Sequence, residues 1–314
     1  MRRQASTRGN FVRHVAFERL EPRLPLAGNV SASLDEVLEI RGDGAANDIL
    51  ITQQSNGTVV IEGRDGTRIN GRSSVRFNGD DLEKSDIRLF GGNDTLTVRN
   101  LRVTTDHNIE MGQGNDTVTL NKSRSGVVTS IKTDDGSDRV TAAGIRTGSD
   151  LNILTGQGKG YVDVRDSTIG GSLTAISLDS ADQVRFEDLS IAKDLKIETA
   201  KGNDVIRVTD VTVRLTASIS TDLGHDRVDA VRLETRQDLN IETKEGDDDV
   251  SLTDTSSRKN IKVNVGNGED RVEVDAVFAA FDAEFLGGDE FDVFVNNGVR
   301  AGQDLEIKEF ERRV

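Results

Sequence analysis

Apolar and polar residues alternate along most of this chain in short segments. LNILT from Leu151, VDV from Val162 and LSI from Leu189 are examples. An alternation with a period of two predicts β-strands, and no segment has the spacing of a helix. Corners rich in Gly, Asn and Asp separate the segments, and these residue types favour tight turns. The pattern therefore predicts about three short strands in each repeating unit.

The unit recurs every 22 residues without an insertion between residues 87 and 307. Its most regular position is acidic in nine of ten units: Asp94, Asp116, Asp138, Gly160, Asp182, Asp204, Asp226, Asp248, Asp270 and Asp292. Gly precedes this position by two residues in eight units, an apolar residue follows it by two in all ten, and another apolar residue precedes it by seven. Such self-similarity is typical of repeat proteins.

A repeat of constant length built from strands predicts an all-β fold in which each unit makes one coil and the next coil stacks on it. We expect a right-handed parallel β-helix, or β-solenoid, with about three short strands per 22-residue coil. Ten coils at the usual strand spacing give an axis of about 50 Å. Stacked β-branched residues would fill the thin core. A column of Thr and Ser at residues 133, 155, 177, 199, 221 and 243 is expected to face inward near a corner.

The two ends of the chain depart from the repeat. Residues 31–86 lose the 22-residue step, and ILITQQSNGTVVIEG from Ile49 has an Asn-Gly turn typical of a β-hairpin. We expect these residues to cap the solenoid, because an uncovered end strand would pair with another chain. Six of the 11 Phe residues lie in the last 37 residues and are expected to plug the open core, or else to form a docking face for another domain. The predicted divisions are 1–30, 31–86 and 87–314.

Composition narrows the function classes. The 314 residues carry a net charge of −15, which argues against nucleic acid as the main partner because phosphate binding needs clustered Lys and Arg. The same carboxylates suit divalent cations. There is no Cys, so neither disulfides nor thiolate metal sites can form, and no apolar run is long enough for a transmembrane helix.

The aspartate positions create an electrostatic problem. Carboxylates stacked about 4.8 Å apart repel one another by roughly 0.9 kcal/mol even in water. Three remedies are open: hydrogen bonds from backbone amides of the same turn, neighbouring Arg139, Arg227 and Arg271, or calcium ions between coils. The first gives a metal-free ladder of turns, and the third gives a metal site.

The turn sequence GQGNDTV from Gly112 resembles part of the hemolysin-type (RTX) nonapeptide GGxGxDxUx, whose stacked loops hold calcium. That resemblance implies Ca²⁺ as the cofactor. Adjacent acidic or Gly-rich coils would supply the six or more oxygen ligands that calcium requires. The predicted metal-site residues are Asp94, Gly112, Gly114, Asp116, Asp248, Gly266, Gly268 and Asp270. No catalytic residue is predicted.

The N-terminal segment differs in charge from the rest. The first 28 residues hold six Arg against two Glu, and FERLEPRLPLAG from Phe17 resembles the LEPR-xLL signature at the start of many large bacterial surface and secreted proteins. The resemblance implies export or sorting to the cell surface. Expected partners are then components of the cell envelope or the extracellular matrix, with an extracellular or cell-surface location.

Two function classes remain. A spacer or interaction surface needs uniform coils, which this chain has. A polysaccharide lyase or hydrolase, the alternative, needs aromatic platforms and convergent acids or bases. The chain has one Tyr (Tyr161), no Trp, and scattered His14, His107 and His225, of which His225 is expected to replace an Asn in a turn. We therefore expect a structural or adhesive protein rather than an enzyme.

Overall fold

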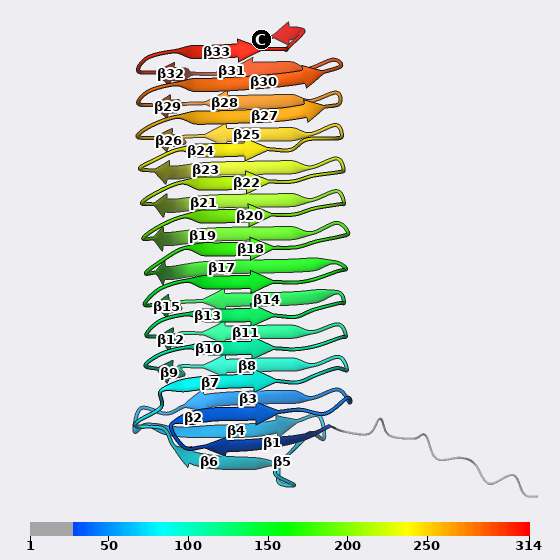
Figure 1. Ribbon diagram of the computed structural model, residues 1–314, viewed down its shortest axis with the longest axis vertical. Helices are drawn as coiled ribbons and strands as arrows, with labels where there is room; N and C mark the ends of the chain where they lie inside the picture. The colour runs from blue at the N-terminus through cyan, green and yellow to red at the C-terminus, as the bar shows by residue number, and fades with distance from the viewer. Residues whose placement is uncertain (1–27) are drawn as a thin grey trace, which may run out of the picture.

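The computed structural model describes residues 28–314, and within that range every regular element is a β-strand. Figure 1 shows a straight stack of coils with the N-terminal strands at one end and the C-terminal strands at the other. The predicted parallel β-solenoid is confirmed. The segment that resembles the LEPR-xLL signature lies almost wholly in residues 1–27, outside the described part of the chain.

Two sheets form the walls of the solenoid. The first sheet has 14 strands. In chain order they are β1 (Asn29–Leu34), β2 (Val37–Arg41), β5 (Arg68–Ile69), β7 (Lys84–Arg88), β10 (His107–Glu110), β13 (Thr129–Lys132), β16 (Leu151–Leu154), β18 (Leu173–Ile176), β20 (Leu195–Glu198), β22 (Ala217–Ser220), β24 (Leu239–Glu242), β27 (Ile261–Asn267), β30 (Ala283–Asp289) and β33 (Leu305–Lys308).

The second sheet has 20 strands and contains both remaining strand positions of each coil. In chain order they are β3 (Asp48–Gln53), β4 (Thr58–Arg64), β6 (Ser74–Asn78), β8 (Thr95–Arg99), β9 (Arg102–Val103), β11 (Thr117–Asn121), β12 (Arg124–Ser125), β14 (Asp138–Ala143), β15 (Arg146–Thr147), β17 (Gly160–Ile169), β19 (Gln183–Ile191), β21 (Val205–Val213), β23 (Arg227–Thr235), β25 (Asp249–Thr253), β26 (Ser256–Ser257), β28 (Arg271–Asp275), β29 (Val277–Ala279), β31 (Val293–Asn296), β32 (Val299–Ala301) and β34 (Arg312–Arg313).

Successive coils pair in parallel and in register. Ile109 of β10 lies between Ile87 of β7 and Ile131 of β13, each 22 residues away. The prediction of three short strands per coil needs one correction. In β17, β19, β21 and β23 the second and third segments form one continuous strand of nine or ten residues. The bend itself is kept, because a residue of positive φ such as Asp188 stands there in these coils, as Asn100 and Lys122 do in coils with separate strands.

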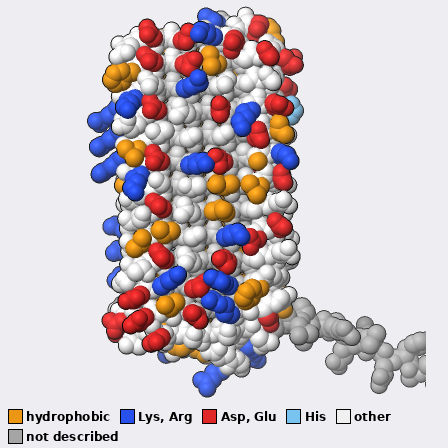
Figure 2. Space-filling view, viewed as in Figure 1, with side chains coloured by type: hydrophobic (Ala, Val, Ile, Leu, Met, Phe, Trp, Pro, Cys, Tyr) orange, Lys and Arg blue, Asp and Glu red, His pale blue; other side chains and the backbone are white. Residues whose placement is uncertain are grey.

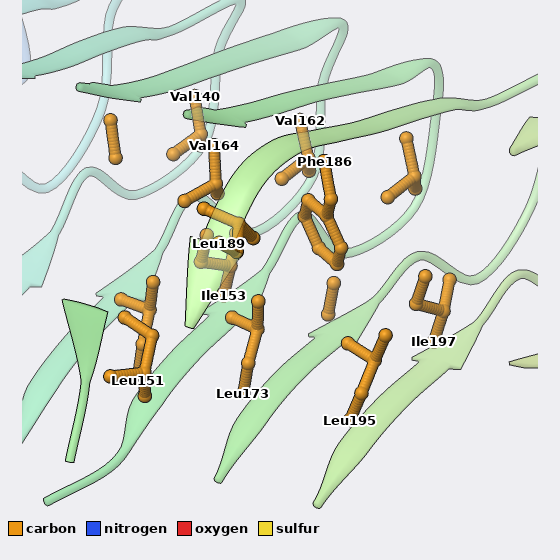
Figure 3. Packing of buried hydrophobic residues seen from close by; sticks show 14 of the residues in the cluster. Val140, Leu151, Ile153, Val162, Val164, Leu173, Phe186, Leu189, Leu195 and Ile197 are labelled. Atoms are coloured by element: carbon orange, nitrogen blue, oxygen red, sulfur yellow. The ribbon is translucent and has the colours of Figure 1, made fainter. Parts of the chain in front are cut away.

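The core is a narrow file of stacked apolar side chains between the two sheets. Figure 3 shows Val140, Val162 and Val164 on the second sheet and Leu151, Leu173 and Leu195 on the first. Phe186 is fully buried and its ring points toward the first sheet. Ala175 stands at the facing strand of that coil, where neighbouring coils have Ile. A small residue opposite a large one keeps the core at a constant width.

Both ends are capped. At the N-terminal end β3 and β4 form the predicted antiparallel hairpin, and β3 pairs in parallel with β8 of the first full coil. At the C-terminal end Phe285, Phe294 and Phe310 are buried and pack with tilted rings, whose centroids lie 5.1 and 5.2 Å apart. The expected plug is therefore built from three of the six Phe residues. The other three, at positions 278, 281 and 291, are about half exposed.

Glycines make the close coil-to-coil contact at one corner. Gly224 has φ of +146°, and a Cβ there would lie 1.6 Å from the carbonyl oxygen of Gly202. Gly114, Gly136 and Gly246 have the same contact with the coil before them. The Gly of each GxGND-like corner is thus required for coils to stack at strand spacing.

We predict that Gly224→Ala destabilises the solenoid, because the added methyl group clashes with a backbone atom that cannot move independently. Overpacking of this kind costs about 1–3 kcal/mol. Chemical denaturation followed by circular dichroism measures the loss. Gly44→Ala is the matched control, because a Cβ at Gly44 meets no atom within 4 Å. Equal stability of the two variants would contradict the prediction.

Candidate functional site

The aspartate column consists of Asp94, Asp116, Asp138, Asp182, Asp204, Asp226, Asp248, Asp270 and Asp292, and it is buried. Each side chain has a relative exposure of 3% or less. The position lies just before or at the start of a strand of the second sheet, two residues ahead of a core residue such as Val118. Alternation along the strand places both side chains on the inner face. The column therefore runs inside the corner of the solenoid.

Each carboxylate of the column holds a backbone amide of the preceding coil. The amide of Asp94 donates to Oδ1 of Asp116 at 2.7 Å, and the amide of Asp116 donates to Oδ1 of Asp138 at 2.8 Å. The same bond recurs at 2.7–2.8 Å for the coils from Asp182 to Asp292. The expectation that each Asp binds an amide of its own turn is wrong. The ladder instead ties every coil to its neighbour.

Gly160 interrupts the column. Its amide still donates to Oδ1 of Asp182, at 2.5 Å, but it offers no carboxylate, and the amide of Asp138 donates to the carbonyl of Lys159 instead. A Cβ at Gly160 would lie 2.6 Å from Oγ1 of Thr155. The hydroxyl groups of Thr155 and Ser177 bond to each other at 2.8 Å beside this gap. At this irregular coil a hydrogen bond between two hydroxyl groups thus lies beside the position that lacks a carboxylate.

The ladder ends on two residues that the 22-residue step does not identify. Asn47 donates its backbone amide to Oδ1 of Asp94 at 2.7 Å and its Nδ2 to the same oxygen at 3.2 Å. At the other end Oε2 of Glu311 accepts the amide of Asp292 at 2.7 Å. Asn47 is 47 residues before Asp94 and Glu311 is 19 after Asp292, so neither falls in register. The sequence feature that could have pointed to them is residue type, because Asn47 has an amide side chain and Glu311 has a carboxylate.

The second carboxylate oxygen is left without a partner. Oδ2 of all nine column residues is buried and has no hydrogen-bond partner within residues 28–314. Burial raises the pKa of Asp94 to about 6 and the pKa of Asp116, Asp182, Asp248 and Asp270 to about 7, while the bonded amides act in the opposite direction. A desolvated carboxyl favours its neutral form.

The Thr and Ser column lies inward, as predicted, with exposures of 3% or less. In four coils a Thr stands five residues before the Asp, and its hydroxyl lowers the pKa of that carboxyl against the larger effect of burial. The pairs are Thr133 with Asp138, Thr199 with Asp204, Thr221 with Asp226 and Thr243 with Asp248. The hydroxyls of Thr133, Thr221 and Thr243 themselves donate to backbone carbonyls of the next coil, so Oδ2 of the Asp stays without a partner.

The three arginines proposed to neutralise the column do not do so. Arg139 stacks on the ring of Tyr161 in the next coil, 3.8 Å from its centroid. Arg227 forms salt bridges with Asp229 at 2.8 Å and Asp249 at 2.7 Å. Arg271 pairs with Glu273. This expectation is wrong because each Arg follows the Asp by one residue and therefore points to the outer face.

A second ladder runs on the outer side of the same corner. Oδ1 of Asn93 accepts the amide of Asn115 at 2.9 Å, and Oδ1 of Asn115 accepts the amide of Ser137 at 2.8 Å. Further along, Nδ1 of His225 accepts the amide of Asp247 at 2.9 Å. His225 thus occupies a turn position that other coils fill with Asn, as predicted. In this ladder each side chain accepts an amide of the following coil, whereas each carboxylate of the buried column accepts an amide of the preceding coil.

A third ladder joins the turns before the strands of the first sheet. Oδ1 of Asp150 accepts the amide of Ser172 at 2.8 Å, and Oδ1 of Asp194 accepts the amide of Thr216 at 3.1 Å. Oδ1 of Asn260 accepts the amide of Asp282 at 3.1 Å. The acidic surplus of the chain is therefore used largely as acceptors for backbone amides at corners.

The predicted calcium residues lie together in pairs of adjacent coils but do not form a cage. Asp94 and Asp116 are consecutive rungs, as are Asp248 and Asp270. Gly112, Gly114, Gly266 and Gly268 pack on carbonyl groups of the preceding coil. Within residues 28–314 no three His, Asp or Glu side chains gather as metal ligands. Calcium needs six to eight oxygens, so the column does not fit the ion, and calcium binding stays a prediction.

The coils are joined by backbone ladders, so we predict the same melting temperature in calcium and in chelator. Circular dichroism of the full chain at neutral pH measures this. A ligand that binds only the folded state raises stability by mass action. A melting temperature that is several degrees higher in calcium than in chelator would therefore support the calcium site predicted from the sequence and contradict a metal-free ladder.

The raised pKa values predict that stability falls as the pH rises. The folded-state pKa of about 7 lies above the ordinary value of 3.8, so the folded protein holds more protons than the unfolded chain between these limits. The stabilising contribution is complete below about pH 4 and is lost as the pH rises through 6–7. For each group, every unit by which the folded-state pKa exceeds the ordinary value contributes about 1.4 kcal/mol to the free energy of unfolding, and this contribution is lost at high pH.

Urea midpoints at pH 5 and pH 8 test this, because exposed carboxyls of ordinary pKa are ionised at both. We expect a lower midpoint at pH 8. Asp116→Asn, which keeps the acceptor but cannot ionise, should make the difference smaller, whereas Asp275→Asn at an exposed position should leave it unchanged. A midpoint that rises from pH 5 to pH 8 would refute the assignment.

Residues 28–314 include no helix that is both long and apolar enough to cross a membrane. Comparison of the chain with protein-family models, with curated proteins and with solved structures finds no match. Function must therefore be argued from the site and the surface of this chain.

Proposed function

We propose that this protein is a rigid, non-catalytic β-solenoid that acts as a spacer and presents an interaction surface outside the cell. The observation that carries the proposal is the buried ladder, which begins at Asn47 and ends at Glu311 and so covers the full set of coils. A function that needs a moving lid would not require the coils to be tied to one another along the whole axis.

Rigidity follows from the number of independent links between coils. Parallel strand pairing joins each coil to the next in both sheets. Three columns of corner side chains add amide acceptors, one of them fully buried. In repeat proteins each unit contacts only its neighbours, so the stability of the stack depends on the interfaces between neighbouring coils. The proposal does not need calcium, because the backbone ladders connect the coils without metal.

The location rests on the N-terminal segment and the charge. The resemblance to the LEPR-xLL signature supports export or display at the cell surface. A net charge of −15 keeps an extended rod soluble and free of self-association. Components of the cell envelope or of the extracellular matrix are the proposed partners.

The experiment that tests the spacer removes two coils, residues 183–226. Because the repeat is in register, we expect this variant to fold with the same cross-section and a long axis shorter by about 10 Å. Small-angle X-ray scattering measures both dimensions. Collapse of the variant, or an unchanged length, would contradict the proposal. Protease treatment of intact cells that express the full chain tests surface display, which digestion of the rod would support.

A further inference from the structure

A cleft opens where the N-terminal cap meets the stack. β9 pairs with β12 on one side, while on its other side the loop of the β3–β4 hairpin stands away from it. The cleft between them has a volume of about 1050 Å³. Gln53 holds the loop in place: its Oε1 accepts the amide of Arg102 at 2.9 Å and its Nε2 donates to the carbonyl of Gly79 at 3.1 Å. The cleft is thus built by the cap.

Three arginines in register line this cleft. Arg124 of β12 lies between Arg102 of β9 and Arg146 of β15. All three are exposed, as is Lys122 beside them, and none of the four forms a salt bridge within residues 28–314. Guanidinium groups at strand spacing repel by roughly 0.9 kcal/mol in water. The cleft also has two acidic residues, Asp80 and Asp166, so its lining is net positive.

The basic residues continue beyond the cleft along the same edge. Two positions further in the repeat, a second set of exposed Arg residues occupies three later coils: Arg214, Arg236 and Arg258. Arg102, Arg124 and Arg146 lie on strands, whereas Arg214, Arg236 and Arg258 lie at the bend directly after the strand. Both sets are exposed. Lys193 and Lys259 flank the second set. We name these eight residues the basic track: Arg102, Arg124, Arg146, Lys193, Arg214, Arg236, Arg258 and Lys259.

The basic track is long and narrow, with an offset of two residues between its two Arg sets. From the coil of Arg102 to that of Arg258 there are seven strand spacings, or about 34 Å. Figure 2 shows Lys and Arg side chains following one another along the left edge, the side on which β9, β12 and β15 lie in Figure 1. Gly126 beside Arg124 and Gly148 beside Arg146 are exposed and leave the backbone bare, as does Gly170 in the next coil. A thin polymer could therefore approach the guanidinium groups closely.

We propose that the basic track binds a linear acidic polysaccharide, which lies along the solenoid axis with its carboxylates on Arg102, Arg124 and Arg146 in the cleft. Arg binds carboxylate with two parallel hydrogen bonds. A polymer that carries one charge on each ring matches a single file of cations better than a compact anion does. The inference rests on the proposed interaction surface and names the ligand class for one edge of it.

Nucleic acid fits the track less well. Single strands are held by aromatic side chains on which the bases stack, and none of the residues that line the cleft is aromatic. A duplex is wider than the file of cations. It would overhang the faces on either side of the edge, in a chain of net charge −15.

Isothermal titration of the full chain with linear polygalacturonate oligomers tests the proposal. We expect binding that weakens as salt rises, and no binding of a neutral glucan of equal length. Replacing Arg102, Arg124 and Arg146 together by Ser should weaken binding at least tenfold. The control replaces Lys132, Lys196 and Lys262 by Ser, which removes the same charge from the first sheet and should change affinity less than twofold.

The outcomes separate this inference from the proposed function. Equal binding by the Arg variant and the protein, or no binding by the protein, would overturn the basic track and leave the spacer intact. Tighter binding of single-stranded DNA than of polygalacturonate would overturn the ligand class. Release of new reducing ends from the polymer would overturn the non-catalytic spacer, while loss of binding in the Arg variant would still support the track.

Discussion

The whole architecture depends on one hydrogen bond that is repeated at 22-residue intervals, from a backbone amide in one coil to a buried carboxylate in the next. Strand pairing holds the flat walls of a solenoid, but corners need another link, because the chain turns there and its amides leave the sheet. An acceptor on a short side chain supplies that link. The glycine two residues earlier allows the neighbouring backbone to come close enough for it.

The buried column is a compromise between two energies. The amide bond favours a charged acceptor, whereas desolvation of the second oxygen favours a neutral acid. Hydrogen bonds to charged groups are worth about 1.5–3 kcal/mol, which is comparable with the penalty of burying an unpaired polar atom. A Thr hydroxyl lowers the pKa in only four of the coils, and the amide groups of Asn47 do so for Asp94, so the column is a set of similar but unequal acids.

The fold could be predicted from the sequence because each coil repeats its apolar positions without insertion. Burial of Asp116 could also have been predicted, since it shares the parity of Val118. Asn47 and Glu311 could not be found, because their spacing follows the caps rather than the repeat. The basic track was missed for a different reason: its two Arg sets occupy different repeat positions, so it becomes one feature only when the coils are stacked.

The direction of the buried ladder has a consequence for how such a chain can change in evolution. Each coil of the ladder offers one amide toward its C-terminal neighbour, and each except the coil of Gly160 offers one carboxylate toward its N-terminal neighbour, so the units that carry the Asp are interchangeable. In-frame duplication or loss of one such unit, which is 66 nucleotides long, would lengthen or shorten the protein and leave no bond of the ladder unmade. The residues that end the ladder, Asn47 and Glu311, differ from each other and from the repeated units. A protein with any number of coils would therefore carry one copy of each.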